Sequence, residues 1–427
     1  MSVPELTSSE LARSRRWPGA LRSRDLRLFW AGETISKLGN SVSTVALPLV
    51  AVVTVHAGAF VVSSLVAAEW LPWLLIGLPV GAWVDRLPPR RVMVTADALS
   101  LVLFASVPIA AWLGALTVVQ LVAVALLAGA AGVFFQTAYQ VYLPSLVDER
   151  ELERANALMQ GSEAASQVVG PGVAGALAAA VGAVSGMMLD AVSFLVSAVC
   201  LLSIRAREPL ADGARVRSSL RYDIAEGLRF VTRDPYLRPL TIAGAISNLG
   251  MVGYQAILIV FLVRIVGVSP GGVGVLIALC SLGGVIGAAC ATRIARRFGS
   301  ARGYLICELV APAAALLIPL TAAGPRVALF VVGGLAVVAG VVAGNVIKGS
   351  WRQLYCPREL LGRVITSSQL LNYGVIPVGA LLAGILASAL GVRVSLWIMT
   401  GTMAISPIVL LFSQIRTRTE FPASPAE

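Results

Sequence analysis

Long apolar stretches alternate with short basic patches along almost the whole chain. Each stretch holds mainly Ala, Val, Leu and Gly, and its length is close to the roughly 20 residues that an α-helix needs to cross a hydrocarbon core. Twelve such stretches follow one another, at approximately 28–54, 60–84, 92–113, 115–139, 157–182, 185–204, 239–263, 271–292, 303–323, 326–347, 364–390 and 393–414. The pattern predicts an all-α integral membrane protein with twelve transmembrane helices and no separate soluble domain.

The composition and the charge distribution support a membrane location. Of the 427 residues 57% are hydrophobic and 13% are charged, against roughly 25% charged in soluble domains. The net charge of +11 could suggest a nucleic-acid partner, but its distribution argues against one. All but four of the 33 Lys and Arg residues fall on one side of the predicted spans, whereas Arg264, Arg326 and Arg393 fall on the other and Lys37 lies inside the first span. This positive-inside pattern predicts a multi-pass protein of the cell membrane with cytoplasmic N- and C-termini, whose basic groups meet the lipid bilayer.

The two halves of the chain repeat one another. Residues 35–39 (Ile-Ser-Lys-Leu-Gly) match residues 246–250 (Ile-Ser-Asn-Leu-Gly), and three further matches follow in the same order at nearly one offset. The chain therefore divides into 1–204, a cytoplasmic linker at 205–238, and 239–427. Apolar residues at helical spacing within 222–231 predict an amphipathic helix on the membrane surface. The parallel repeat predicts two six-helix bundles with a substrate site between them near the bilayer midplane.

The connection after the second span carries a motif of a glycine, an acid and three arginines. It reads Gly81-Ala82-Trp83-Val84-Asp85-Arg86, with a basic pair at Arg90 and Arg91, and it resembles the signature of the major facilitator superfamily of transporters. The resemblance implies that two bundles rock about a central site and that this loop latches a cytoplasmic gate. The expected gate residues are Gly81, Asp85, Arg86, Arg90 and Arg91, their second-half counterparts Gly287, Arg296 and Arg297, and the acidic partners Asp97, Glu163 and Glu308. The alternative is a basic loop that only sets the topology.

The fifth span contains a glycine–proline element. Residues 170–175 read Gly-Pro-Gly-Val-Ala-Gly and resemble the helix-5 element of drug/proton antiporters, which are exporters. Proline bends a helix, and we expect Gly170, Pro171 and Gly175 to allow tight contact with the other bundle. Residues 143–157, 189–194 and 227–230 also resemble the enterobactin-exporter and macrolide-efflux branch of the superfamily. That resemblance implies efflux driven by proton entry.

Ionisable residues inside predicted spans are functional candidates because charge is costly in hydrocarbon. Glu69 lies near the middle of the second span without a basic neighbour in sequence. An unpaired carboxylate there takes up a proton readily, so Glu69 is our first candidate for proton coupling and Glu33 our second. Glu33 and Lys37 are four residues apart, which suits either a neutralised pair or two groups that line the cavity. Asp190 is expected to be a cap or an inter-helix contact.

The remaining candidates for substrate contact are mainly aromatic and amide side chains, which suit an amphiphilic organic solute. With Lys37 they are Asn40, Trp70, Trp73, Gln136, Tyr139, Asn248, Tyr254, Gln255 and Asn345. No nucleophile–base pair and no CxxC motif occurs, and the one histidine is His56, so we expect no enzyme, no catalytic residue, no metal and no cofactor. The prediction is a monomeric secondary transporter that exports drug-, antibiotic- or siderophore-like molecules by proton antiport. The alternative is a proton-coupled importer of a small organic nutrient.

Overall fold

The computed structural model describes residues 23–84, 86–205 and 220–424, which fold into helices and connecting turns. Asp85 of the expected gate and the basic residues up to Arg22 lie outside the described residues. In the first half, the helices are α2 (Arg24–Val53), α3 (Ala59–Val84), α4 (Pro89–Trp112), α5 (Val118–Ser145), α6 (Glu149–Ala180) and α7 (Ser185–Ser203).

The second half repeats this series of long helices after one short helix. The elements are α8 (Leu220–Arg233), α9 (Leu237–Val260) with its continuation η2 (Phe261–Val266), α10 (Pro270–Phe298), α11 (Ser300–Ala315), η3 (Ile318–Leu320), η4 (Gly324–Arg326), α12 (Val327–Tyr355), α13 (Arg358–Leu390), α14 (Val392–Leu411) and η5 (Gln414–Thr417). Side chains fix where some helices begin, because they accept hydrogen bonds from free backbone N–H groups. Ser23 Oγ accepts one from Leu26 at the start of α2, and Asp234 Oδ1 accepts one from Leu237 at 2.7 Å at the start of α9.

Eleven helices in the described part of the chain are long and apolar enough to cross a membrane. The remaining long helix, α6, has 32 residues, but its first turns carry the charged residues Glu151, Glu153 and Arg154. The prediction of spanning helices is thus confirmed by length and composition for eleven segments. Helix α6 packs against α2 in its own half and against α10 in the other.

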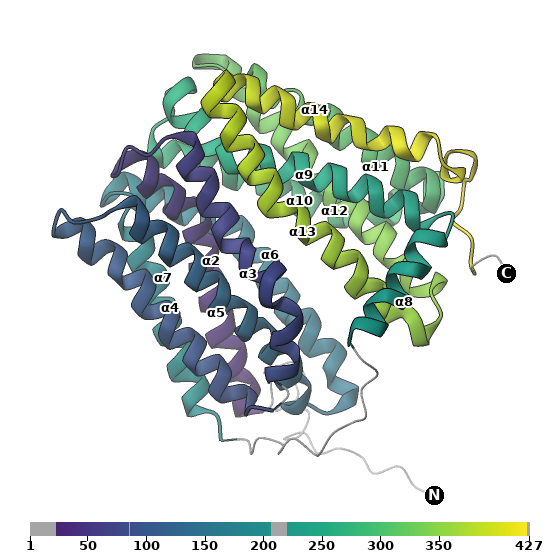
Figure 1. Cartoon of the computed structure of the whole chain (residues 1–427), viewed down its shortest axis with the longest axis horizontal. Helices are drawn as coiled ribbons and strands as arrows, with labels where there is room; N and C mark the ends of the chain where they lie inside the picture. The colour runs from purple at the N-terminus through teal and green to yellow at the C-terminus, as the bar shows by residue number, and fades with distance from the viewer. Residues whose placement is uncertain (1–22, 85, 206–219, 425–427) are drawn as a thin grey trace, which may run out of the picture.

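The helices pack in two groups that follow the two halves of the sequence (Figure 1). Within the first group α2 lies against α6 and α7, and α4 lies against α5 and α7. Within the second, α10 and α11 lie against α12, and α9 lies against α13 and α14. The groups meet where α3 packs on α13 and α6 packs on α10. We call the end where α2 begins and α14 ends the terminal end, and the opposite end the distal end.

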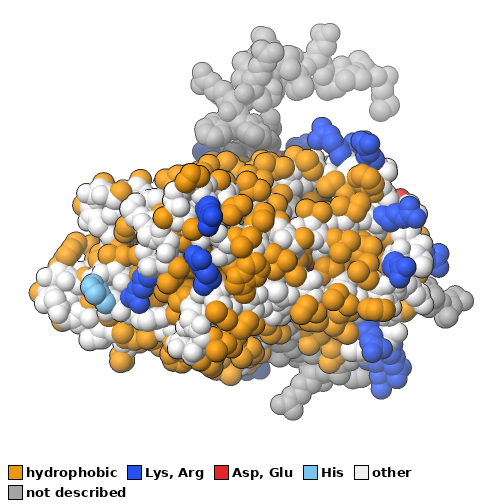
Figure 2. Space-filling view, turned by 90° about the horizontal axis from the view of Figure 1, so that it is seen from above, with side chains coloured by type: hydrophobic (Ala, Val, Ile, Leu, Met, Phe, Trp, Pro, Cys, Tyr) orange, Lys and Arg blue, Asp and Glu red, His pale blue; other side chains and the backbone are white. Residues whose placement is uncertain are grey.

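The surface separates apolar from basic side chains (Figure 2). Apolar side chains form a broad belt. Lys and Arg gather at one end of the molecule, the histidine lies at the other, and a few further Lys or Arg side chains lie toward the histidine end. Large exposed residues such as Val102, Leu75 and Leu354 belong to this apolar surface. A soluble monomer rarely exposes so continuous an apolar area, and a lipid-facing protein requires it.

Short segments at the terminal end are tied to the second group. Helix α8 packs against α13 and α9 and buries Val231, whereas Leu228 is 37% exposed. The helix expected within 222–231 therefore exists, and it contacts protein at Val231. The last described residues fold back over α11 and α12. Phe421 stacks on Trp351 at 4.5 Å between ring centroids, and Glu420 Oε2 accepts hydrogen bonds from the backbone N–H and the hydroxyl of Ser300 at 2.9 and 2.6 Å. We call residues 419–422 the C-terminal strap.

Candidate functional site

A cavity of about 320 Å³ lies within the first group of helices and is lined by α2 to α7. Its polar lining consists of carboxyl, amide, hydroxyl and ammonium groups, from Glu33, Ser36, Lys37, Asn40, Ser43, Thr44, Glu69, Asp97, Ser100, Gln136 and Glu163. Its aromatic lining consists of Trp70, Trp73, Phe104, Phe135 and Phe194. A cavity of this size and mixed chemistry can hold an organic molecule.

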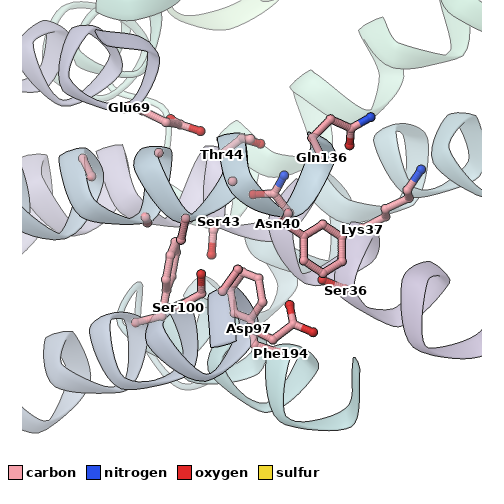
Figure 3. Close-up of a pocket in the computed structure, with 18 of the residues that line it drawn as sticks. Ser36, Lys37, Asn40, Ser43, Thr44, Glu69, Asp97, Ser100, Gln136 and Phe194 are labelled. Carbon is pink, nitrogen blue, oxygen red and sulfur yellow. The ribbon is translucent and has the colours of Figure 1, made fainter. Parts of the chain in front are cut away.

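Helix α2 supplies one wall of the cavity along a single face. The lining positions 33, 36, 37, 40, 43, 44 and 47 recur every three or four residues, which is the spacing of one helical face. Figure 3 shows Lys37, Asn40 and Thr44 following one another along the helix. The sequence analysis identified Glu33, Lys37 and Asn40 but missed Ser36, Ser43 and Thr44. The same spacing could have identified these hydroxyl groups.

Lys37 makes its ion pair with another helix. Its Nζ lies 2.8 Å from Oε2 of Glu163 on α6, and 5.5 Å from the centroid of the Tyr139 ring on α5. Of the two alternatives for Glu33 and Lys37, the structure favours two groups that line the cavity, since Lys37 pairs with Glu163. The expectation for Glu163 needs correction, because it lines the cavity and pairs with Lys37 and not with a gate arginine. The pair links three helices of the cavity wall.

Two further carboxyl groups of the cavity are deeply buried. Glu33 is 4% exposed and Asp97 is 1% exposed, and Oε1 of Glu33 and Oδ2 of Asp97 have no hydrogen-bond partner among the described residues. Asp97 was expected to hold a gate arginine, and the structure instead places it in the cavity wall because α4 packs against α7 in the interior of its own group. Both groups could exchange protons with the cavity.

Glu69 occupies the cavity from α3. It is partly buried, and no hydrogen bond or ion pair of its side chain is found in the described part of the chain. Its backbone is held close to α5 by Gly129, where a Cβ atom would lie 3.1 Å from Cα of Glu69. Trp70, the next residue, and Trp73, one turn further, contact Tyr373 of α13 at 5.5 and 6.5 Å between ring centroids. These rings are the contact between the cavity and the second group of helices.

The other predicted contact residues do not line this cavity. Tyr139 lies beside it through Lys37. In the second group, Asn248 donates a hydrogen bond from Nδ2 to the backbone carbonyl of Asn372 at 2.7 Å, Tyr254 is buried, and Gln255 and Asn345 are exposed. The expected site between two bundles is thus, in this conformation, a cavity built by the first group alone.

The glycine–proline element brings the two groups together at the distal end. A Cβ atom on Gly175 would lie 2.6 Å from the carbonyl oxygen of Gly271 and 2.8 Å from Cα of Gly274 on α10, so the two backbones are in direct contact. The carbonyl of Pro171 also faces Gly274, whereas Gly170 faces Ser41 of α2. Gly175 and Pro171 therefore make the expected contact with the other half, and Gly170 contacts its own half.

The distal end has two further contacts between the groups. Gly384 of α13 lies against Ser63 of α3, where a side chain would not fit. Arg264 of η2 donates a hydrogen bond from Nη2 to the carbonyl of Val52 at 3.5 Å. Together with the α6–α10 crossing, these contacts close the distal end.

The gate residues at the terminal end are separated from one another. Arg90 donates hydrogen bonds from Nε and Nη2 to the carbonyls of Leu201 and Leu202 at 2.7 and 2.6 Å, so it holds the last turn of α7 within its own group. Arg86 and Arg91 are exposed, as are Arg296 and Arg297. No ion pair of these arginines is found among the residues that the structure describes. The expected contacts of the cytoplasmic gate are therefore not formed among the described residues in this conformation.

Two other gate expectations also differ from the structure. No described residue lies within 4 Å of the place where a Cβ on Gly81 would be, whereas Gly287, its counterpart in the second half, contacts the backbone of Ala339 on α12. Glu308 interacts electrostatically with Lys348 of α12, whose Nζ lies 5.9 Å from the centroid of the Tyr304 ring. Glu308 is thus partnered within its own half. No group of three His, Cys, Asp or Glu side chains suited to a metal occurs in the described ranges.

Comparison with known proteins agrees with this architecture. The family model described as Major Facilitator Superfamily matches residues 29–375 and 240–427. The "Multidrug efflux pump Tap" of Mycolicibacterium fortuitum is 30% identical over 386 residues, which cover 88% of this chain and 92% of that protein. "Macrolide efflux protein A" of Streptococcus pyogenes is 22% identical over 51% of this chain and 53% of its own. A solved bacterial homologue of the iron transporter ferroportin, in an inward-facing state, shares the fold with a TM-score of 0.74 at 16% identity, over 92% of this chain and 99% of its own.

Proposed function

Because this chain belongs to the major facilitator superfamily, we propose that it is a secondary active transporter that exports amphiphilic small molecules by proton antiport. The cavity is the main support for this proposal, because both aromatic side chains and the carboxyl groups of Glu33 and Asp97, which have no counter-ion among the described residues, line it. Aromatic and apolar surface suits an amphiphilic solute, and unpaired carboxyl groups suit a proton. Relatives named as efflux pumps support export as the direction.

The topology that goes with this function has twelve spans and a cytoplasmic terminal end. In it α6 is the twelfth spanning helix, residues 1–204 and 239–427 form the two bundles, and residues 205–238 form the linker. The gathering of basic side chains at one end supports this orientation in the cell membrane (Figure 2). We propose that the protein works as a monomer, with the proton gradient as its energy source.

The closed distal end corresponds to the inward-facing state of this topology. For alternating access the α6–α10 crossing at Gly175 must separate, and the terminal end must close. Arg86 and Arg91 are then the residues of the motif that can reach acidic partners, since Arg90 already holds α7. Rigid-body motion of this kind is the expected mechanism for a parallel-repeat transporter.

Glu69 is the first candidate for the coupling residue and Glu33 the second. Glu69 lines the cavity without a partner, so its charge can change without breaking an ion pair. Lys37 is already neutralised by Glu163. We expect Glu69→Gln to reduce proton-driven export at least tenfold and to leave exchange of the solute across the membrane within a factor of two.

The test uses inverted membrane vesicles from an efflux-deficient host, with ethidium as an amphiphilic fluorescent probe. Export corresponds to ethidium accumulation inside the vesicles that requires an imposed proton gradient. A proton-coupled importer, the second candidate, would instead accumulate its solute in intact cells. Accumulation that persists after the gradient is collapsed would contradict antiport, and the same result for Glu69→Gln as for the wild type would exclude Glu69.

A further inference from the structure

Two buried carboxyl groups lie where α2, α4 and α7 meet, and the mechanism above does not use them as a pair. Asp97 of α4 is 1% exposed and Asp190 of α7 is 0% exposed. Ser197 lies against the Asp97 carboxyl group and Ser43 against that of Asp190, but Oδ2 of each carboxyl group has no partner with hydrogen-bond geometry among the described residues, and neither group has an ion pair there. Burial strongly disfavours an ionised carboxylate that has no counter-ion, so both groups favour a bound proton in this conformation.

Glycine brings Asp190 next to the helix that forms the cavity wall. A Cβ atom on Gly39 of α2 would lie 2.5 Å from Oδ1 of Asp190 and 2.6 Å from Cβ of Ser193. Ser193 donates a hydrogen bond from Oγ to Oδ1 of Asp190 at 3.0 Å, which leaves Oδ2 unsatisfied. Any side chain at position 39 would displace Asp190 from α2.

The cavity reaches this pair through hydroxyl groups. Asp97, Ser43 and Ser100 line the cavity, and Figure 3 shows Asp97 and Ser100 together below the α2 helix that carries Ser43. Ser43 also lies against the Asp190 carboxyl group. Hydroxyl groups both donate and accept hydrogen bonds, so a proton can pass between the cavity and Asp190 along them.

The charged groups around Asp97 and Asp190 lie on the neighbouring helices α2, α3 and α6. Asp97 and Asp190 interact electrostatically with each other, Asp190 also with Glu69 of α3, and Asp97 with Glu33 of α2. Helix α5 contributes only the Gln136 amide to the polar lining, and Lys37 on α2 is paired with Glu163 of α6. Like charges disfavour one another at short range in a low dielectric, so the pair cannot hold two negative charges cheaply.

We propose that Asp97 and Asp190 together form a proton-binding site that holds the coupling proton between Glu69 and Glu33. Asp97 exchanges the proton with the cavity, and Asp190 holds it against Gly39. When the proton leaves, a negative charge lies between α2 and α7, which changes the packing of the helix that carries the cavity face. The use of this proton in transport rests on the antiport proposed above, whereas its binding does not.

Infrared difference spectroscopy of the purified full chain tests the binding directly. The difference spectrum between buffers at about pH 6 and about pH 9 excludes ordinary exposed carboxyl groups, which titrate near about 4 and are ionised in both buffers. It contains the carbonyl stretch only of carboxyl groups that still hold a proton in the less alkaline buffer. We expect part of this signal to disappear in both Asp97→Asn and Asp190→Asn, and to be retained in Glu153→Gln, an exposed carboxyl group of the same half. Asp190→Glu keeps a carboxyl group at the site and should keep a shifted band. If neither asparagine variant loses any of the signal, the proton-binding site does not exist.

Transport in proteoliposomes then tests the use of the proton. We expect Asp97→Asn and Asp190→Asn to reduce ethidium accumulation driven by a proton gradient at least tenfold. Asp190→Asn, whose side chain does not line the cavity, should keep ethidium exchange without a gradient within a factor of two. Retained exchange shows that a variant is folded. If accumulation by the wild type does not depend on the proton gradient, antiport is refuted. The infrared result still decides whether the proton-binding site exists. Normal proton-driven accumulation by both asparagine variants would overturn the role in coupling.

Discussion

Gly175→Ala tests whether the α6–α10 crossing holds the distal end closed. The added Cβ would lie 2.6 Å from the carbonyl oxygen of Gly271, where ordinary contact begins at 3.4 Å, so the two backbones must separate by about 0.8 Å. Overpacking of this kind costs about 1–3 kcal/mol, and that cost falls only on the conformation in which the helices touch. The ratio of distally closed to distally open molecules should therefore fall by a factor of about 5 to 150.

Gly172→Ala is a matched control on the same helix. Its Cβ would lie 3.6 Å from Cβ of Ala278, which is ordinary contact. Each of the two Gly→Ala changes raises the intrinsic helix propensity by the same amount, about 1 kcal/mol. The assay is electron–electron resonance between spin labels on Ala115→Cys and Ala323→Cys, at exposed distal positions of the two halves, in a background without native cysteines. Gly175→Ala should shift the distances toward longer values and Gly172→Ala should not. Identical distributions for the two variants would refute the assignment of the crossing as the distal closure.

Three other predictions concern the cavity and the C-terminal strap. Lys37→Gln and Glu163→Gln should each slow ethidium export, and the double variant should be no slower than either single variant. Because Glu163 is 39% exposed, a double-mutant cycle of thermal stability should give a coupling energy of only about 0.2–1 kcal/mol. Additive losses of export in the double variant would argue against the pair. Phe421→Ala should lower the free energy of unfolding by about 3 kcal/mol, because the ring is 7% exposed and stacks on Trp351; an unchanged melting temperature in detergent would show that the strap is not docked. The hydrogen bonds from Ser300 hold the pKa of Glu420 below its ordinary value, so they stabilise the docked strap at neutral pH, and this stabilisation is lost as the pH falls through the lowered pKa. A spin label on Ser424→Cys should become mobile in acid, and Glu420→Gln should make it mobile at every pH. A label that stays immobile throughout would contradict the role of Glu420.

Most of the spanning helices could be predicted because apolar length is a property of local sequence, and eleven helices of the described chain are long and apolar enough to cross a membrane. Apolar length sets where a chain can cross a membrane, and the side on which arginines fall sets the direction of each crossing. Helix α6 shows the limit of composition alone. The sequence predicted an apolar stretch at 157–182, whereas the helix in the structure begins at Glu149, and its charged first turns place it outside the eleven helices that qualify as spans by composition.

The side-chain partners could not be predicted, because they depend on how distant helices pack. Glu33 and Lys37 are neighbours on one helix, and that proximity suggested a pair. In the structure Lys37 forms its ion pair with Glu163, more than a hundred residues away, and Glu33 is buried without an ion pair among the described residues. The depth of Asp97 was underestimated for the same reason, since α4 is covered by α7 and not by lipid at that position. Gly175 was predicted correctly because a glycine–proline element restricts what can pack beside it.

The aromatic contact between the halves gives the protein an intrinsic optical reporter. Trp70 and Trp73 of the first half lie at the cavity and touch Tyr373 of the second half. When the halves move or a solute enters, the polarity around these two indole rings changes, and with it the wavelength and intensity of their emission. Replacing the other tryptophans by phenylalanine leaves the emission of these two rings alone. Stopped-flow fluorescence of the unlabelled protein can therefore time the motion of the halves.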